Sequence, residues 1–73
     1  MKVFLTGGAG YIGSACLRHL VRHGHEALAF DNLSEGNRSA VPDGLLWVGD
    51  ILDRAELQLA LLDYKPDVVM HFA

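Results

Sequence analysis

A glycine-rich segment, Thr6-Gly-Gly-Ala-Gly-Tyr-Ile-Gly13, constrains the fold of this chain more than any other feature of its sequence. It follows Lys2–Thr6 (KVFLT), whose β-branched and aromatic residues are typical of a short buried strand. It leads into Tyr11–His23, in which apolar residues recur at the spacing of a helix. Gly24 follows and suits a helix end in the left-handed conformation. The apolar residues of this helix are Ile12, Cys16, Leu17, Leu20 and Val21. A strand that passes through glycines into a helix begins a βαβ unit, so the segment predicts a parallel α/β sheet.

The rest of the chain continues this alternation of strands and helices. Asn32–Gly44 is poor in apolar residues and is predicted to be a loop with at most one helical turn. Asp53, with Glu56 three residues later, fits a capping box that opens a helix. That helix is expected to end near Tyr64, because Pro66 disfavours helical geometry in the residue before it. Three further strands are predicted, over His25–Asp31, Leu45–Gly49 and Asp67–Ala73.

Right-handed crossovers would place the four strands in the order 3-2-1-4, in a Rossmann-type doubly wound sheet with one main helix on each face. Four strands about 4.8 Å apart make a sheet roughly 19 Å wide, whereas one helix is about 10–12 Å across. Each face is then only half covered, and Leu59 and Leu62 point away from the apolar face of the second helix. We therefore expect residues 1–73 to be the amino-terminal part of a larger domain, with the remainder and a substrate domain beyond Ala73. Self-association through the two leucines, as in a homodimer, is the alternative.

Composition excludes several classes of function. The formal net charge of −3 argues against nucleic acid or an anionic membrane as a partner, since both reward clustered Lys and Arg. The single cysteine, Cys16, cannot form an internal disulfide, which favours a reducing compartment. No apolar run approaches the roughly 18 residues of a membrane span, and no leader pattern precedes the first strand. We expect a cytoplasmic protein.

Three glycines of the loop each have a physical task in holding a pyrophosphate. Gly7 permits a tight turn, Gly10 lets the phosphates approach the backbone, and Gly13 lets the helix pack closely. The unpaired N–H groups and the dipole of the helix then face the phosphates. Asp31, at the end of the second strand, would accept hydrogen bonds from the ribose hydroxyls and repel a 2′-phosphate, and the nearest Arg is Arg38. The pattern predicts NAD rather than NADP.

Two other interpretations of the loop are weaker. Gly8–Gly13 has the glycine spacing of a P-loop, but Ser14 stands where a Lys is needed and Ala15 where a Ser or Thr is needed. Without that Lys and that magnesium-binding hydroxyl, an NTPase is excluded. The glycines could also form only a tight turn, with Asp31 a solvated strand end. The coincidence of strand, glycine spacing and acid favours a cofactor site.

The segments TGGAGYIGS, DNLSEG at Asp31–Gly36, Gly49-Asp50-Ile51 and the terminal HFA resemble extended short-chain dehydrogenase/reductases. The likeness covers nearly the whole chain and is greater to the sugar-nucleotide 4-epimerases than to the dehydratases and decarboxylases that share the loop. It implies an enzyme that uses NAD to remove a hydride from hexose C4 of a nucleotide sugar. The hydride would return to the other face of a 4-keto sugar. A non-catalytic dinucleotide-binding module is the alternative from a different class.

The resemblance also implies which residues hold the cofactor. Backbone groups of Tyr11 and Ile12 would contact the pyrophosphate, and Asp31 with the turn after it would surround the adenosine ribose. Asp50 would bond the adenine amino group, and Ile51 would lie against the ring. Phe72 and Ala73 would lie near the nicotinamide ribose. The full set of expected cofactor-binding residues is Gly7, Gly10, Tyr11, Ile12, Gly13, Asp31, Asn32, Leu33, Ser34, Gly36, Asp50, Ile51, Phe72 and Ala73.

No catalytic residue is assigned within the chain. The family's general base is a Tyr with a Lys four residues later, whereas Tyr11 is followed at that distance by Ala15. Tyr64 is followed by Val68, so the catalytic pair is expected beyond the last residue.

Other chemistry-bearing side chains have structural interpretations. His19 and His23, one helical turn apart, are expected to be solvated, because no acid or cysteine completes a metal ligand set on their face. Trp47 and His71 are expected in the core, His71 with a local hydrogen bond. Cys16 is expected to be an inert, buried thiol.

Overall fold

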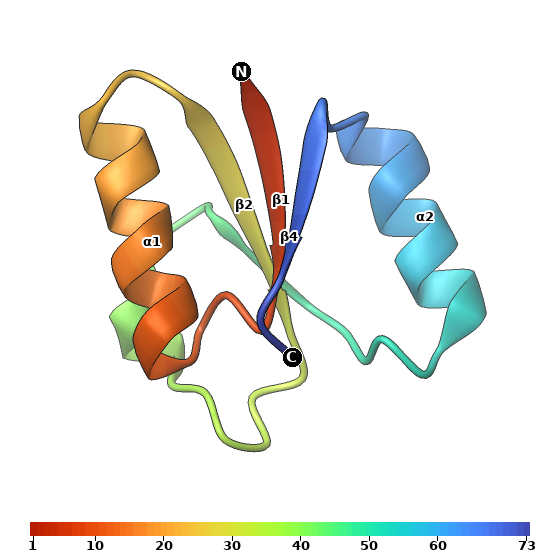
Figure 1. Cartoon of the computed structure of the whole chain (residues 1–73). Coiled ribbons are helices and arrows are strands. Elements are labelled where there is room, and N and C mark those ends of the chain that lie inside the picture. The colour runs from red at the N-terminus through yellow and green to blue at the C-terminus, as the bar shows by residue number, and fades with distance from the viewer.

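The computed structural model describes all 73 residues as a four-stranded sheet with an α-helix on each side (Figure 1). The neighbouring strands are parallel and their order is β3-β2-β1-β4, which confirms the predicted Rossmann-type arrangement. The elements are β1 (Lys2–Thr6), α1 (Tyr11–Arg22), β2 (Glu26–Asp31), the 3₁₀ turn η1 (Arg38–Ala40), β3 (Leu46–Val48), α2 (Arg54–Tyr64) and β4 (Val68–His71). The last three strands are shorter than predicted at one or both ends.

The register of the sheet brings the carboxyl ends of all four strands to one edge. Thr6, at the end of β1, pairs with Phe30 of β2 and with His71 of β4. Asp31, the next residue of β2, pairs with Val48 at the end of β3. The loops that follow the four strands therefore leave the sheet at this edge, where parallel α/β sheets bind their ligands.

Two clusters of apolar side chains hold the layers together, one on each face of the sheet. Successive residues of β1 point to opposite faces, so Leu5 packs beneath α1 and Phe4 packs beneath α2. The rings of Phe4 and Phe30 lie 5.5 Å apart between their centroids, and both side chains are fully buried. Full burial of such a side chain stabilises the fold by about 2–3 kcal/mol.

Helix α1 buries only some of its apolar side chains against the sheet. Leu17 is fully buried, with Cys16 and Leu20 partly buried against the same cluster. Ile12 and Val21, also apolar residues of this helix, are 63% and 41% exposed. They lie near the two ends of the helix. Gly24 has φ +86°, which confirms the predicted left-handed helix end.

Helix α2 begins at the predicted N-cap but forms only half of the capping box. Asp53 Oδ1 accepts the N–H of Glu56 at 3.2 Å. The Glu56 carboxylate does not accept the backbone N–H of Asp53, which would be the second bond of the box. Its Oε1 instead accepts the indole N–H of Trp47 at 2.7 Å. This bond lets Trp47 pack, half-buried, against the cluster beneath α2. Lys65 ends the helix in the left-handed conformation, with φ +54°.

Two other expectations need correction. The crossover between β2 and β3 covers more of the sheet than predicted, because Val41 is 6% exposed in the cluster beneath α1. Leu33 and Leu45 pack against that cluster from the same segment. His71 is exposed rather than in the core, because β4 is an edge strand of this sheet. Its Nδ1 is hydrogen-bonded to Thr6 Oγ1 on the neighbouring strand.

The outer surface of α2 is apolar in places. Leu59 and Leu62 are 56% and 64% exposed, in agreement with their predicted direction away from the sheet. Helices of this structure are all too short or too polar to cross a membrane.

Candidate functional site

A cavity of about 380 Å³ lies where the strands end. The loops after all four strands contribute to it, as the parallel register requires. Most of the expected cofactor-binding residues line it, whereas Tyr11, Ile12, Gly13 and Leu33 lie outside its wall. The lining residues are Gly7, Gly10, Phe30, Asp31, Asn32, Ser34, Glu35, Gly36, Gly49, Asp50, Ile51, Leu52, Phe72 and Ala73. Four lining residues are outside the expected set: Phe30, Gly49, Leu52 and Glu35, the last of which lies within the Leu33–Gly36 turn expected around the ribose.

The three expected glycines have different surroundings. Gly7 has φ +69°, and a Cβ there would lie 2.7 Å from the backbone nitrogen of Ala73. A Cβ on Gly13 would lie 2.3 Å from the carbonyl oxygen of Gly7. Around Gly10 the space is open, and its closest neighbour, the same carbonyl oxygen, would be 3.4 Å from a Cβ. Gly7 and Gly13 are therefore glycines because protein backbone fills the space, whereas Gly10 leaves space that a ligand can fill.

Gly8 is a structural glycine that sequence reasoning missed. It is buried, and a Cβ there would lie 2.5 Å from the Cβ of Ala29 on β2. The signal was available as a second glycine beside Gly7, outside the spacing that the other three follow.

The first turn of α1 presents unpaired backbone donors beside the cavity. The N-cap residue is Gly10, which has no side chain to satisfy them. The first helical hydrogen bond runs from Ser14 N–H to the Gly10 carbonyl at 2.9 Å. The N–H groups of Tyr11, Ile12 and Gly13 have no acceptor in the protein, and the first turn holds no acidic residue. Three free donors at the positive end of a helix favour an anion such as a phosphate.

Asp31 connects the glycine loop to the turn after β2. Its side chain is 8% exposed, and its two oxygens accept the N–H groups of Ala9 at 2.9 Å and Leu33 at 2.8 Å. Each carboxylate oxygen can accept a second hydrogen bond, so the group can still bind hydroxyls. Leu33 has φ +64°, a conformation that the bond to Asp31 helps to hold. Gly36 packs directly against the Asp31 carboxylate, and a Cβ at position 36 would lie only 2.9 Å from Asp31 Oδ2.

The charges around the cavity are all of one sign. Asp31, Glu35 and Asp50 line it, and no Lys, Arg or His does. Phe30 and Ile51 add apolar surface on the same walls. The cavity therefore suits an uncharged polar group with a flat apolar face, and the anion donors lie to one side of it, at the start of α1.

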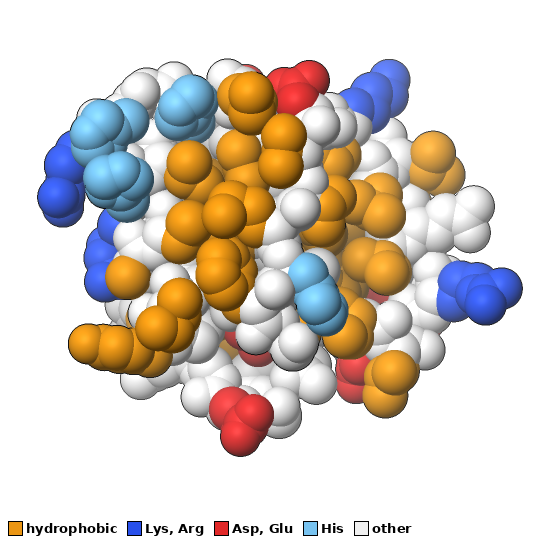
Figure 2. Space-filling model, viewed as in Figure 1, with side chains coloured by type: hydrophobic (Ala, Val, Ile, Leu, Met, Phe, Trp, Pro, Cys, Tyr) orange, Lys and Arg blue, Asp and Glu red, His pale blue; other side chains and the backbone are white.

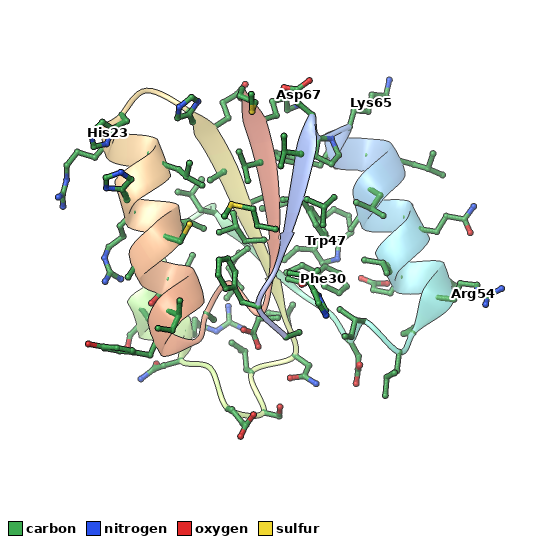
Figure 3. The ribbon with its side chains drawn as sticks, in the orientation of Figure 1. His23, Phe30, Trp47, Arg54, Lys65 and Asp67 are labelled. Carbon is green, nitrogen blue, oxygen red and sulfur yellow. The ribbon has the colours of Figure 1, made fainter.

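A second tyrosine, Tyr64, lies far from this cavity. Its hydroxyl is buried without a hydrogen-bond partner, and burial raises the pKa of Tyr64, with further contributions from Glu26 and Asp67. The Lys2 ammonium lies 4.6 Å from the centre of its ring. Lys2 begins β1, and Asp67 lies at the amino-terminal edge of the sheet (Figure 3). This Tyr–Lys pair is therefore at the edge opposite the cavity.

The histidines of α1 lie on the surface near its carboxyl end (Figure 2). The rings of His19 and His23 are 4.2 Å apart between centroids, and His23 Nδ1 bonds the His19 carbonyl at 2.9 Å. No group of three or more His, Cys, Asp or Glu side chains in the structure could hold a metal ion. Cys16 is partly buried, with its Sγ 3.9 Å from Met70 Sδ.

The fold and the glycine loop define a Rossmann-type α/β domain with unpaired backbone donors at the start of its first helix. Comparison with known families gives the more particular assignment: residues 3–73 match the model described as the NAD dependent epimerase/dehydratase family, and the chain belongs to that family.

Individual relatives agree with this assignment. The chain is 49% identical over 74 residues to a UDP-glucose 4-epimerase of Lactobacillus helveticus, with all of this chain and 22% of the relative covered. It is 41% identical over 80 residues to a dTDP-glucose 4,6-dehydratase of Neisseria meningitidis, with 99% and 22% covered. The chain thus spans about a fifth of the length of these relatives.

Solved structures give the same picture. The fold matches Thermus thermophilus UDP-glucose 4-epimerase in complex with NAD at a TM-score of 0.96 and 38% identity, covering 100% of this chain and 24% of that one. It matches the Brucella ovis UDP-glucose 4-epimerase in complex with NAD at a TM-score of 0.94 and 44% identity, covering 99% and 22%.

Proposed function

We propose that this chain is the cofactor-binding part of an NAD-dependent sugar-nucleotide 4-epimerase that interconverts UDP-glucose and UDP-galactose. Family membership and the UDP-glucose 4-epimerases among its relatives support this activity. One observation carries the proposal: the free donors at the start of α1 lie beside a cavity whose walls hold Asp31 and Asp50.

The residues present fit NAD group by group. The pyrophosphate would lie against open Gly10 and accept from the N–H groups of Tyr11 and Ile12. Asp31 would accept from the adenosine ribose hydroxyls, with Ser34 and Gly36 alongside. The adenine amino group would donate to Asp50, and its ring would lie on Ile51. Bound NAD supplies a hydride acceptor that later returns the hydride.

The chain's own residues bind and orient the cofactor. Asp31 accepts the N–H groups of Ala9 at 2.9 Å and Leu33 at 2.8 Å, and these bonds would hold its carboxylate in place for the ribose. The carboxylates of Asp31, Glu35 and Asp50 would repel the 2′-phosphate of NADP. Phe72 and Ala73 leave β4 directly against Gly7, which would place them beside the nicotinamide ribose.

The proton-transfer residues belong elsewhere in this proposal. The Tyr-x-x-x-Lys sequence of the family does not occur in the chain, and Tyr64 lies against Lys2, at the edge of the sheet opposite the cavity. Residues 1–73 alone would be inactive, and a nucleotide sugar would be a partner of the whole protein. A cytoplasmic location is part of the same proposal, supported by the lone cysteine. Exposed Leu59 and Leu62 would pack on the remainder of the domain, and a homodimer through them is the alternative.

The test is an assay of the full-length protein with UDP-galactose, in which formation of UDP-glucose is measured. Gly10→Val should abolish NAD binding and epimerisation, because the branched side chain fills the space that the pyrophosphate needs. Ala15→Val is the matched control, since Ala15 is exposed one turn further along α1. Unchanged NAD binding in Gly10→Val would overturn the cofactor assignment.

A second candidate is a 4,6-dehydratase of the same family, and the 41% identity to the Neisseria meningitidis dehydratase favours it over a decarboxylase. Parallel assays with dTDP-glucose separate the two, because dehydration gives a 4-keto-6-deoxy sugar and epimerisation does not. A decarboxylase would release carbon dioxide from a uronic acid substrate. A non-catalytic dinucleotide sensor would bind NAD and convert none of these substrates.

A further inference from the structure

Asn32 and Asp50 follow neighbouring strands, and each is fixed by its own loop. Asn32 Oδ1 accepts the N–H of Ser34 at 2.9 Å. Asp50 Oδ1 accepts the N–H of Leu52 at 2.9 Å. The two remaining polar atoms face each other, and Asn32 Nδ2 donates to Asp50 Oδ2 at 3.4 Å.

These bonds determine which way the Asn32 amide points. The oxygen of an amide only accepts and its nitrogen only donates, so the bond from Ser34 N–H turns the Nδ2 group toward Asp50. No other side chain donates to Asp50, and the other charged residues on the cavity wall, Asp31 and Glu35, are of the same sign. Asn32 therefore fixes one oxygen of the Asp50 carboxylate and thereby limits rotation of the group.

We propose that Asn32 is a positioning residue: it orients the Asp50 carboxylate toward the adenine amino group rather than contacting the ribose itself. The inference rests on the proposed function, because it presupposes that adenine lies against Asp50. It assigns base recognition to two linked turns, one after β2 and one after β3, instead of to a single carboxylate.

The experiment compares two dinucleotides on the full-length protein by isothermal titration. One is NAD, and the other is nicotinamide hypoxanthine dinucleotide, in which an oxo group replaces the adenine amino group. The native protein should prefer NAD. Asn32→Ala should lower that preference by about threefold to tenfold, the range expected for one exposed hydrogen bond, while binding of the hypoxanthine dinucleotide stays the same.

Two further variants make the result specific. Asn32→Asp keeps the oxygen that accepts from Ser34 but places a second carboxylate beside Asp50, so it should lower the preference at least as far as Asn32→Ala. In an Asp50→Asn background, Asn32→Ala should no longer change the preference, because the two residues act as one unit. Asn37→Ala is the matched control, since Asn37 lies in the same segment and accepts only from Ser39.

An equal loss of affinity for both dinucleotides in Asn32→Ala would overturn the inference, because it would indicate direct contact with the shared ribose. Unchanged affinities for both would overturn it as well. A native protein that binds neither dinucleotide would contradict the proposed function itself, and the inference with it.

Discussion

The two glycines at the start of α1 should respond very differently to alanine. At Gly13 a Cβ would lie 2.3 Å from the Gly7 carbonyl oxygen and 2.9 Å from the Gly8 Cα. Both neighbours are backbone atoms in a loop with no free space, so the loop and the helix must move apart. A 2.3 Å contact with a backbone oxygen belongs at the upper end of the usual cost of overpacking, about 3 kcal/mol. Alanine's better helix propensity returns about 1 kcal/mol, so the expected net loss is about 2 kcal/mol.

At Gly10 the expected cost is smaller. The closest contact of a Cβ would be 3.4 Å, and the backbone angles, φ −75° and ψ 176°, suit any residue. Alanine is a poorer N-cap than glycine, so we expect a loss below about 1 kcal/mol. The space that a Cβ enters is the space proposed for the pyrophosphate, so Gly10→Ala should weaken NAD binding while it leaves the fold intact.

The assay is urea unfolding of each variant without cofactor, followed by circular dichroism, with NAD titrations of the same samples. Gly13→Ala should lower the unfolding midpoint clearly more than Gly10→Ala does. A Gly13→Ala protein as stable as the native one would refute the role of close backbone packing. Equal destabilisation by both substitutions would refute the distinction between a filled and an open glycine position.

Three further predictions concern other parts of the chain. Burial raises the pKa of Tyr64 above its ordinary value of 10.0 in the folded state. The free energy of unfolding should therefore not depend on this group below pH 10, and it should fall as the pH rises from there through the folded-state pKa. Tyr64→Phe should remove that loss and, by deleting an unpaired buried hydroxyl, raise the free energy of unfolding by about 1 kcal/mol at neutral pH; a marked destabilisation in urea titrations would contradict this. Asp53→Ala should cost about 1 kcal/mol through loss of the α2 N-cap, whereas Asp63→Ala, an exposed site on the same helix, should change the unfolding midpoint little. NADP should bind at least about tenfold more weakly than NAD at low ionic strength, with a difference that shrinks as salt is added; comparable affinities at low salt would contradict the role of the cavity's three carboxylates.

The fold was predictable because its signals are local and periodic. Strands of three to six mostly apolar residues, one glycine loop and one N-cap at Asp53 are enough to specify the strand order and both helices. The errors arose where a distant partner competes. Glu56 leaves its capping position for Trp47, and His71 is exposed because β4 is at the edge of this sheet. Neither outcome can be read from sequence spacing.

Ten of the fourteen expected cofactor-binding residues line one cavity, but the contacts that they make are not predictable from the sequence. Asp31 was selected for its distance from the glycines, whereas its bonds to Ala9 and Leu33 depend on how two loops meet. The left-handed conformation of Leu33 has no sequence signal, since leucine rarely adopts it. Glu35 lies within the Leu33–Gly36 turn expected around the ribose, but its own position on the cavity wall follows only from the fold.

A crystal structure of the full-length protein with NAD tests the cofactor assignment most directly. We expect the pyrophosphate over Gly10 with its oxygens near the N–H groups of Tyr11 and Ile12, the adenosine ribose on Asp31, and adenine between Asp50 and Ile51. NAD bound at another edge of the sheet, or at this edge with the adenosine away from Asp31 and Asp50, would contradict the assignment.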